Sequence, residues 1–140
     1  NLQLLTMKPV LYVLNTSEAS ENKMDMEKNI PGPYVKVDPI FEKGLDDLIK
    51  KAYETLDLIT YFTTGEDETR GWTIKRNSTA PEAGMAIHTD FRDKFIRAEV
   101  IEWDKLLEVG GYAAAREKGL LRTEGKNYIV KDGDTIEFKI

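Results

Sequence analysis

Hydrophobic positions along the chain change from helical spacing to strand spacing near residue 58. The clearest helix is predicted over residues 42–56, where charged residues occupy one face and apolar residues the other, namely Leu45, Leu48, Ile49, Ala52, Tyr53 and Leu56. After it the pattern predicts two strands, a helix, a strand, two short helices and three strands, at residues 58–63, 69–75, 79–88, 95–102, 104–109, 113–118, 120–122, 128–130 and 135–140. A hairpin, a helix crossing the sheet and further strands are typical of a β-grasp, the ubiquitin-like arrangement. The pattern therefore predicts an α+β domain over residues 57–140.

The first 41 residues lack a complete pattern of their own. Residues 10–14 are continuously apolar, which is typical of a strand buried on both faces of a parallel sheet. One such strand is not stable alone, so we expect its neighbours upstream of residue 1. Residues 16–38 are polar and then punctuated by proline and glycine at 31–33, which predicts a loop or linker. We therefore interpret residues 1–41 as the remnant of a truncated α/β domain followed by a linker, with residues 42–56 as a connecting helix.

Composition narrows the classes of function. The chain has 140 residues, 41% hydrophobic and 32% charged, which describes a globular protein. Its net charge of −5 argues against a dedicated nucleic-acid binder but leaves a local basic patch open. With no cysteine and one histidine, disulfides, zinc fingers, a cysteine nucleophile and a multi-histidine metal site are excluded. No run is long and apolar enough to span a membrane, and the start lacks the layout of a signal peptide, so a cytoplasmic location is expected.

Candidate catalytic chemistry is sparse. Phosphoryl transfer needs a phosphate cradle, a magnesium ligand and a positioned water, and the sequence has no Gly-x-x-x-x-Gly-Lys-Ser/Thr motif. We therefore expect this chain not to hydrolyse nucleotide alone, and we assign it no catalytic residue and no metal ligand. His88 has no nucleophile near it in sequence, which favours a structural role, such as capping a helix end, over a role in a binding surface.

A local excess of basic residues lies between residues 70 and 98. Six cations there face three acidic residues, and Trp72, Phe91 and Phe95 interleave with them. A local excess of this kind is enough to bind a phosphate backbone, with aromatic stacking as a supplement, while a solvated face over an aromatic core is the alternative. Nothing in the sequence indicates sequence-specific DNA binding. The candidate contacts for RNA or the ribosome are Arg70, Lys75, Arg76, Arg92, Lys94 and Arg97.

Several motifs resemble the TGS domain of the YchF/Obg-like ATPases. The resemblance extends over most of residues 57–140, through residues 58–65, 72–75, 79–81, 87–91, 95–100, 113–114, 124–126, Tyr128 and 132–134. Upstream, residues 8–13 and 15–18 resemble the strand and the base-recognition motif of this family, with Asn15-Thr16-Ser17-Glu18 in place of Asn-Lys-x-Asp. The resemblance implies that Asn15 and Glu18 bind the nucleotide base in an intact protein, with tolerance of adenine rather than strict choice of guanine. It also implies ATP or GTP with magnesium as the ligand of the intact family, and none in this chain.

The resemblance implies a function and also shows departures. TGS domains are linked to RNA and ribosome contact, so we expect a regulatory module of a translation-associated ATPase that contacts RNA or the ribosome. A protein–protein interaction module and an enzyme fragment whose activity lies in an absent domain are the alternatives. Asn77 stands where the family usually has glycine and Glu82 where it has glutamine, and the segment between Glu18 and the helix is shorter than expected.

Overall fold

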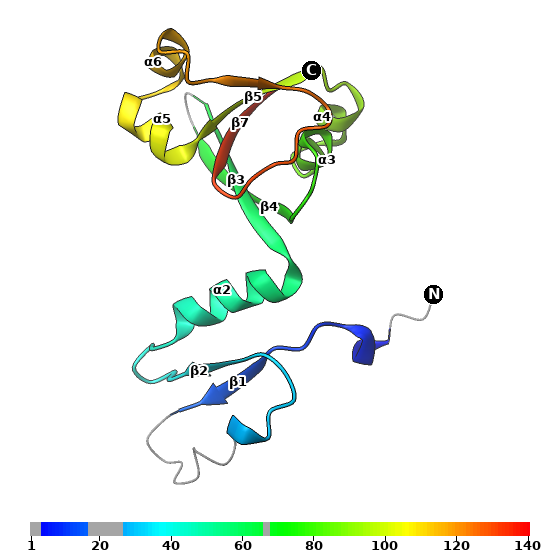
Figure 1. Ribbon diagram of the computed structural model, residues 1–140, viewed down its shortest axis with the longest axis vertical. Coiled ribbons are helices and arrows are strands. Elements are labelled where there is room, and N and C mark those ends of the chain that lie inside the picture. Colours follow the sequence, from blue (N-terminus) through cyan, green and yellow to red (C-terminus); the bar gives the residue numbers. More distant parts are fainter. Residues whose placement is uncertain (1–3, 17–26, 66–67) are drawn as a thin grey trace. The chain divides into compact units, whose positions relative to one another are not determined.

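The computed structural model describes residues 4–16, 27–65 and 68–140. These residues form two compact units, divided between Asp57 and Leu58, and each unit is described here by itself (Figure 1). Most of the core side chains and all of the predicted cations lie in the second unit.

The first unit contains a parallel pair of strands and one helix. A short 3-10 helix, η1 (Leu5–Met7), precedes β1 (Tyr12–Asn15), which pairs in parallel with β2 (Tyr34–Val37). The helix α2 (Leu45–Leu56) packs against β2, whose Val35 and Val37 are buried. One prediction is wrong here, because residues 34–37 of the segment predicted as a loop or linker form the strand β2, which pairs with β1. Within this unit β1 is largely exposed.

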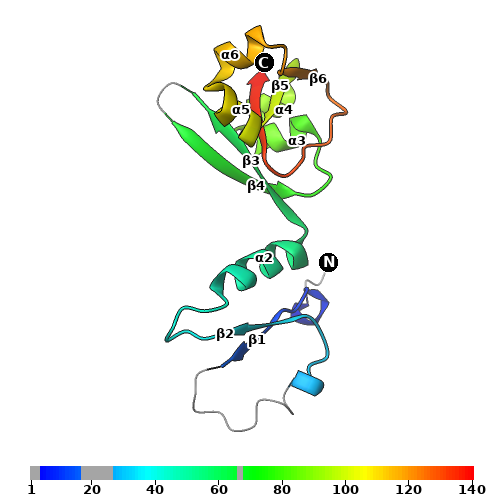
Figure 2. The ribbon, with the colours of Figure 1, turned by 60° about the vertical axis from the view of Figure 1, so that its left-hand side comes forward.

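The second unit is built on a mixed five-stranded sheet. Its strand order is β4-β3-β7-β5-β6, with β3 and β7 parallel and the other neighbours antiparallel. The long hairpin of β3 and β4 is seen along its length in Figure 2. The strands are β3 (Leu58–Thr64), β4 (Thr69–Lys75), β5 (Arg97–Glu102), β6 (Arg122–Glu124) and β7 (Asp134–Lys139). The predicted strand at 128–130 forms only an isolated bridge, between Ile129 and Thr79.

Helices cover the two faces of this sheet. Alternate residues of the strands point to opposite faces, and Tyr61, Ala98 and Val100 are fully buried on the face that carries α3 (Ala80–Met85) and α4 (Thr89–Asp93). The buried hydroxyl of Tyr61 donates a hydrogen bond of 2.9 Å to the carbonyl of Ala83. The opposite face packs Ile101 against Leu106 and Ala115 of α5 (Trp103–Val109) and α6 (Tyr112–Glu117).

The helix predicted over residues 79–88 ends earlier, at Met85, and a second short helix that was not predicted follows it. Thr79 and Glu82 form a capping box at the start of α3, which ends at Met85. His88 then caps the beginning of α4, because its Nδ1 accepts a hydrogen bond of 3.2 Å from the amide of Asp90. This contact agrees with the expected structural role of His88, although the helix that it caps was not predicted.

Candidate functional site

An open groove of about 520 Å³ lies where the end of β4 meets α3. We call it the β4–α3 groove; its lining residues are Ile74, Lys75, Arg76, Asn77, Ser78, Glu82, Met85 and Ala86. Arg92 reaches the same place from α4, since its Nη1 lies 3.1 Å from the sulfur of Met85. The groove therefore gathers Lys75, Arg76 and Arg92, which come from a strand end, a turn and a helix.

The turn at the end of β4 gives the groove its shape. Asn77 has a φ of 65°, in the left-handed region that asparagine tolerates better than most residues, and the amide of Ser78 donates to the carbonyl of Lys75 at 3.2 Å. The resemblance implies glycine at this position, and glycine and asparagine both tolerate this conformation. The departure at this position leaves the turn intact.

Glu82 is the acidic residue that lines the groove. One of its carboxylate oxygens accepts hydrogen bonds from the amide and the hydroxyl of Thr79, at 2.7 and 2.9 Å. The bond from the Thr79 amide is the main reason why the pKa of Glu82 lies below its ordinary value. The carboxylate is therefore ionised at neutral pH, and its charge is directed at the start of α3.

The other predicted cations lie in different surroundings. Arg70 stacks on the ring of Trp72 at 4.1 Å, near the far end of β4 from the groove. The ammonium of Lys94 lies 2.9 Å from the carboxylate of Asp90. Arg97 alternates with the buried Ala98 on β5, so it points to the opposite face of the sheet from α3. The structure thus brings three of the six cations together and separates the other three.

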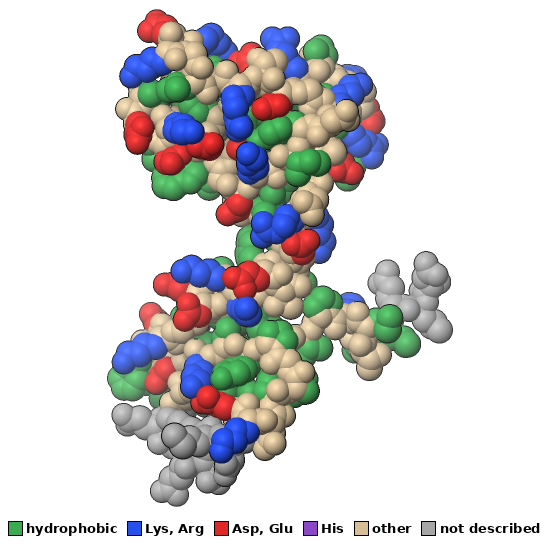
Figure 3. Space-filling view, in the orientation of Figure 1, with side chains coloured by type: hydrophobic (Ala, Val, Ile, Leu, Met, Phe, Trp, Pro, Cys, Tyr) green, Lys and Arg blue, Asp and Glu red, His purple; other side chains and the backbone are tan. Residues whose placement is uncertain are grey.

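Carboxylates also reduce the local positive charge. The Nε of Arg92 lies 2.8 Å from Asp93, and Arg97 lies 3.7 Å from Glu99, whose other oxygen is 2.6 Å from Arg116. On the face of the second unit seen in Figure 3, blue and red side chains are accordingly intermixed. A net count of charges along the sequence does not show which cations are paired, and Glu99, the partner of Arg97, lies just beyond the counted segment.

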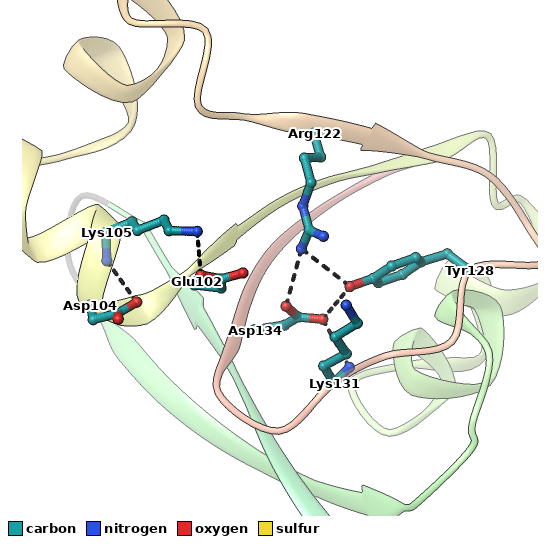
Figure 4. A network of polar contacts seen from close by, with 7 residues as sticks. All are labelled: Glu102, Asp104, Lys105, Arg122, Tyr128, Lys131 and Asp134. Atoms are coloured by element: carbon teal, nitrogen blue, oxygen red, sulfur yellow. Dashed lines mark hydrogen bonds and ion pairs between the residues drawn. The ribbon is translucent and has the colours of Figure 1, made fainter.

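A polar network that the sequence did not reveal fixes the loop before β7. Asp134 is buried, with 1% of its surface exposed, and its carboxylate accepts hydrogen bonds from Tyr128 at 2.6 Å and the amide of Lys131 at 2.9 Å (Figure 4). Arg122 on β6 reaches the same carboxylate at 3.4 Å and Tyr128 at 3.3 Å. Burial, followed by the bond to Asp134, raises the pKa of the Tyr128 hydroxyl. The same tyrosine contacts the start of α3, since its carbonyl accepts a hydrogen bond of 2.9 Å from the amide of Ala80.

The predicted base-binding residues fall in the first unit. Asn15 is the last residue of β1 and is exposed, opposite Val37 in the parallel register, and Glu18 lies outside the described residues. Within the described ranges, no cluster of three or more histidine, aspartate or glutamate side chains could hold a metal ion. None of the helices in those ranges combines the length and apolar character needed to cross a membrane.

Comparison with known proteins gives this arrangement a class. The mixed α+β structure is similar to that of the Schizosaccharomyces pombe YchF GTPase, with a TM-score of 0.82 and 32% identity over 97% of this chain and 44% of that one. A GTP-binding protein from Pyrococcus horikoshii OT3 shares the fold, with a TM-score of 0.65 at 16% identity, covering 94% of this chain and 46% of that one. The class is thus the C-terminal region of a nucleotide-binding protein of the YchF kind.

The sequence comparisons name the family. The family model "YchF-GTPase_C: Protein of unknown function (DUF933)" matches residues 58–140, so the chain belongs to this family. The ribosome-binding ATPase YchF of Bacillus subtilis is 40% identical over 170 residues, covering 99% of this chain and 46% of that protein. Obg-like ATPase 1 of Xenopus laevis is 36% identical over 167 residues, covering 96% and 42%. The resemblance predicted from the motifs is confirmed, and the chain spans less than half the length of these relatives.

Proposed function

We propose that residues 58–140 form a β-grasp module through which a YchF-type ATPase contacts RNA or the ribosome in the cytoplasm, and that this module regulates and does not catalyse. The β3–β4 hairpin, the crossing helix α3 and the parallel neighbours β3 and β7 at the centre of the sheet support the β-grasp assignment. The name of the Bacillus subtilis relative, a ribosome-binding ATPase, supports the choice of partner.

The observation that carries this proposal is the convergence of Lys75, Arg76 and Arg92 at the β4–α3 groove. A guanidinium offers several donors in one plane, so Arg92 can hold Asp93 through Nε and still present its other nitrogens to a phosphate. The carboxylate of Glu82 faces the Thr79 amide, where it stabilises the start of α3. The groove thus offers three cations to a phosphate backbone in a chain whose net charge is −5.

For the first unit we propose a remnant of the nucleotide-binding domain over residues 1–41 and a connecting helix over 42–56. The parallel pairing of β1 and β2 supports this, because parallel strands are normally buried inside larger α/β sheets, and Tyr12 and Val13 are exposed here. In the intact family, ATP or GTP with magnesium would bind mainly through residues that this sequence lacks, with Asn15 and Glu18 beside the base. The sequence has no phosphate-binding loop, so we expect no hydrolysis by this chain alone.

Co-sedimentation of the 140-residue chain with ribosomes tests the proposed contact. The test variant reverses the groove cations, Lys75→Glu, Arg76→Glu and Arg92→Glu, and the matched control reverses the exposed Lys50, Lys118 and Lys126. Three phosphate contacts give a salt slope of about −2, so raising the salt from roughly 50 to 200 mM should weaken binding by about 20-fold.

We expect the groove variant to lose both the binding and its salt dependence, while the control variant keeps them. Equal loss in both variants would show that only total charge matters and would contradict a contact at the groove. Binding that does not depend on salt would favour the protein–protein alternative over phosphate contacts.

A further inference from the structure

An apolar pocket of about 210 Å³ lies between the turn end of the β3–β4 hairpin and α5. We call it the α5 pocket; its lining residues are Phe62, Thr64, Thr69, Trp103, Leu106, Leu107 and Thr135. Phe62 alternates with the buried Tyr61 along β3, so this pocket opens on the opposite face of the sheet from the β4–α3 groove. The hydroxyls of Thr64 and Thr69 hydrogen-bond to each other at 2.6 Å.

Two large apolar side chains beside this pocket are exposed. Leu107 has 72% of its surface exposed and Trp103 has 52%, whereas Leu106 between them is buried at 9%. The indole of Trp103 packs on the backbone at Gly133, where an added Cβ would lie 2.8 Å from its Cδ1. An exposed tryptophan that lines an apolar pocket has the features of an interaction hot spot.

The rim of the α5 pocket is acidic. Asp104 and Glu108 are one helical turn apart, and the helical period places them along the side of Trp103 and Leu107. Glu68, also exposed, precedes the lining residue Thr69. The nearby cation Lys105 contacts the carboxylate of Glu102 at 2.5 Å, so it does not offset the rim charges. A phosphate backbone would be repelled here, and lysine or arginine side chains would be attracted.

We propose that the α5 pocket binds one large apolar side chain of a basic peptide segment in a partner protein. A volume of about 210 Å³ is below the usual range for small-molecule sites and suits a single aromatic or aliphatic side chain. The carboxylates of Asp104 and Glu108 then meet cationic residues that flank this anchor. This site is independent of the proposed phosphate contact, because it lies on the other face of the sheet and carries the opposite charge.

The test uses the full chain and fluorescently labelled lysine-rich peptides that differ at one central position, phenylalanine or alanine. Binding is followed by anisotropy, and the contact is located by NMR on the two tryptophan indoles. We expect the phenylalanine peptide to bind and to shift the indole signal of Trp103 but not that of Trp72. The alanine peptide should bind about tenfold more weakly, because the anchor is the main source of affinity.

Variants of the rim and the anchor site complete the test. Leu107→Ser should lower the affinity for the phenylalanine peptide by about tenfold. The double variant Asp104→Lys and Glu108→Lys should lower this affinity by a similar factor at low salt. Ile96→Ser, which replaces an equally exposed residue outside the pocket, should bind as the wild type does.

Three results would overturn the proposal. The first is that the wild type binds the two peptides with equal affinity, or that Leu107→Ser binds the phenylalanine peptide as tightly as the wild type does. The second is self-association of the chain that Leu107→Ser abolishes, which would assign the pocket to a second copy. The third is competition by an RNA oligonucleotide that shifts the Trp103 indole, which would assign this face to nucleic acid.

Discussion

Replacing Gly84 with alanine tests how closely α3 packs against α4. Gly84 is buried in the last turn of α3, and an added Cβ would lie 2.9 Å from the Cβ of Phe91 and 3.3 Å from its carbonyl oxygen. Neither atom is the end of a flexible side chain. The ring of Phe91 is itself held against Phe138, with 5.9 Å between the ring centroids, so α4 must shift for the methyl group to fit.

Two effects of opposite sign determine how much Gly84→Ala changes the free energy of unfolding. Alanine is favoured over glycine in a helix by about 1 kcal/mol. Overpacking a well-filled core costs about 1–3 kcal/mol, and a clash with backbone atoms belongs in the upper half of that range. The net expectation is a loss of about 1–2 kcal/mol in the free energy of unfolding of the second unit. For a domain of this size, that loss lowers Tm by roughly 5–15 °C.

Tryptophan fluorescence measures this loss in the second unit alone, because both tryptophans, Trp72 and Trp103, lie within residues 58–140. Gly125→Ala is the matched control, since an added Cβ there meets no atom within 4 Å. We expect the control to stay within about 0.5 kcal/mol of the wild type. If Gly84→Ala proves as stable as the control, α4 can shift to make room for the methyl group without loss of stability. That result would refute the reasoning.

Further substitutions test the turn, the ion pair and the buried network by the same unfolding assay. Asn77 has a left-handed φ of 65°, so Asn77→Gly should leave the free energy of unfolding unchanged or raise it, and Asn77→Ala should lower it by about 1 kcal/mol. The opposite order would contradict strain at this position. The hydrogen bond from Arg116 is the main cause that lowers the pKa of Glu99 below 4.5, so its contribution is full at neutral pH and is lost as the pH falls through the lowered folded pKa. Between about pH 5 and 3 the wild type should therefore lose more stability than Glu99→Gln, and parallel pH profiles would count against the pair. Asp134→Ala should cost about 3 kcal/mol and Tyr128→Phe about 1 kcal/mol, because only the first leaves buried donors unpaired; equal costs would argue against the network in Figure 4.

Regular periods predicted most elements of the second unit, but they did not predict α4 in that unit or β2 in the first unit. α4 has five residues, too few to show a helical period, and its start depends on the His88 side chain rather than on a usual capping residue. β2 has four residues after a proline-rich turn, and Val35 and Val37 take their burial from packing that includes α2 and from pairing with a strand far back in the chain. Both elements are therefore set by tertiary contacts that a local pattern does not contain.

The basic character of the candidate site could be predicted from the sequence, but the residues that form it could not. The sequence indicated a basic segment, yet strand alternation sends Arg97 to the other face, and Arg70 stacks on Trp72 away from the groove. The spacing of Trp103, Leu106 and Leu107 is equally typical of internal packing, so the sequence does not predict the α5 pocket. Only the exposure of Trp103 and Leu107 distinguishes an open pocket from a covered core.

The central position of β7 has a consequence for synthesis of the protein. Phe62 on β3 pairs with Thr135, which the ribosome adds 73 residues later, and β7 also supplies the only strand contact between β3 and β5 among the described residues. Until Asp134–Lys139 has left the exit tunnel, the nascent chain holds two separate strand pairs, β3–β4 and β5–β6, with their apolar faces open to solvent. The sheet can therefore close only after β7 has been made, and a stop codon shortly before residue 134 would release two unjoined strand pairs rather than a slightly shorter domain.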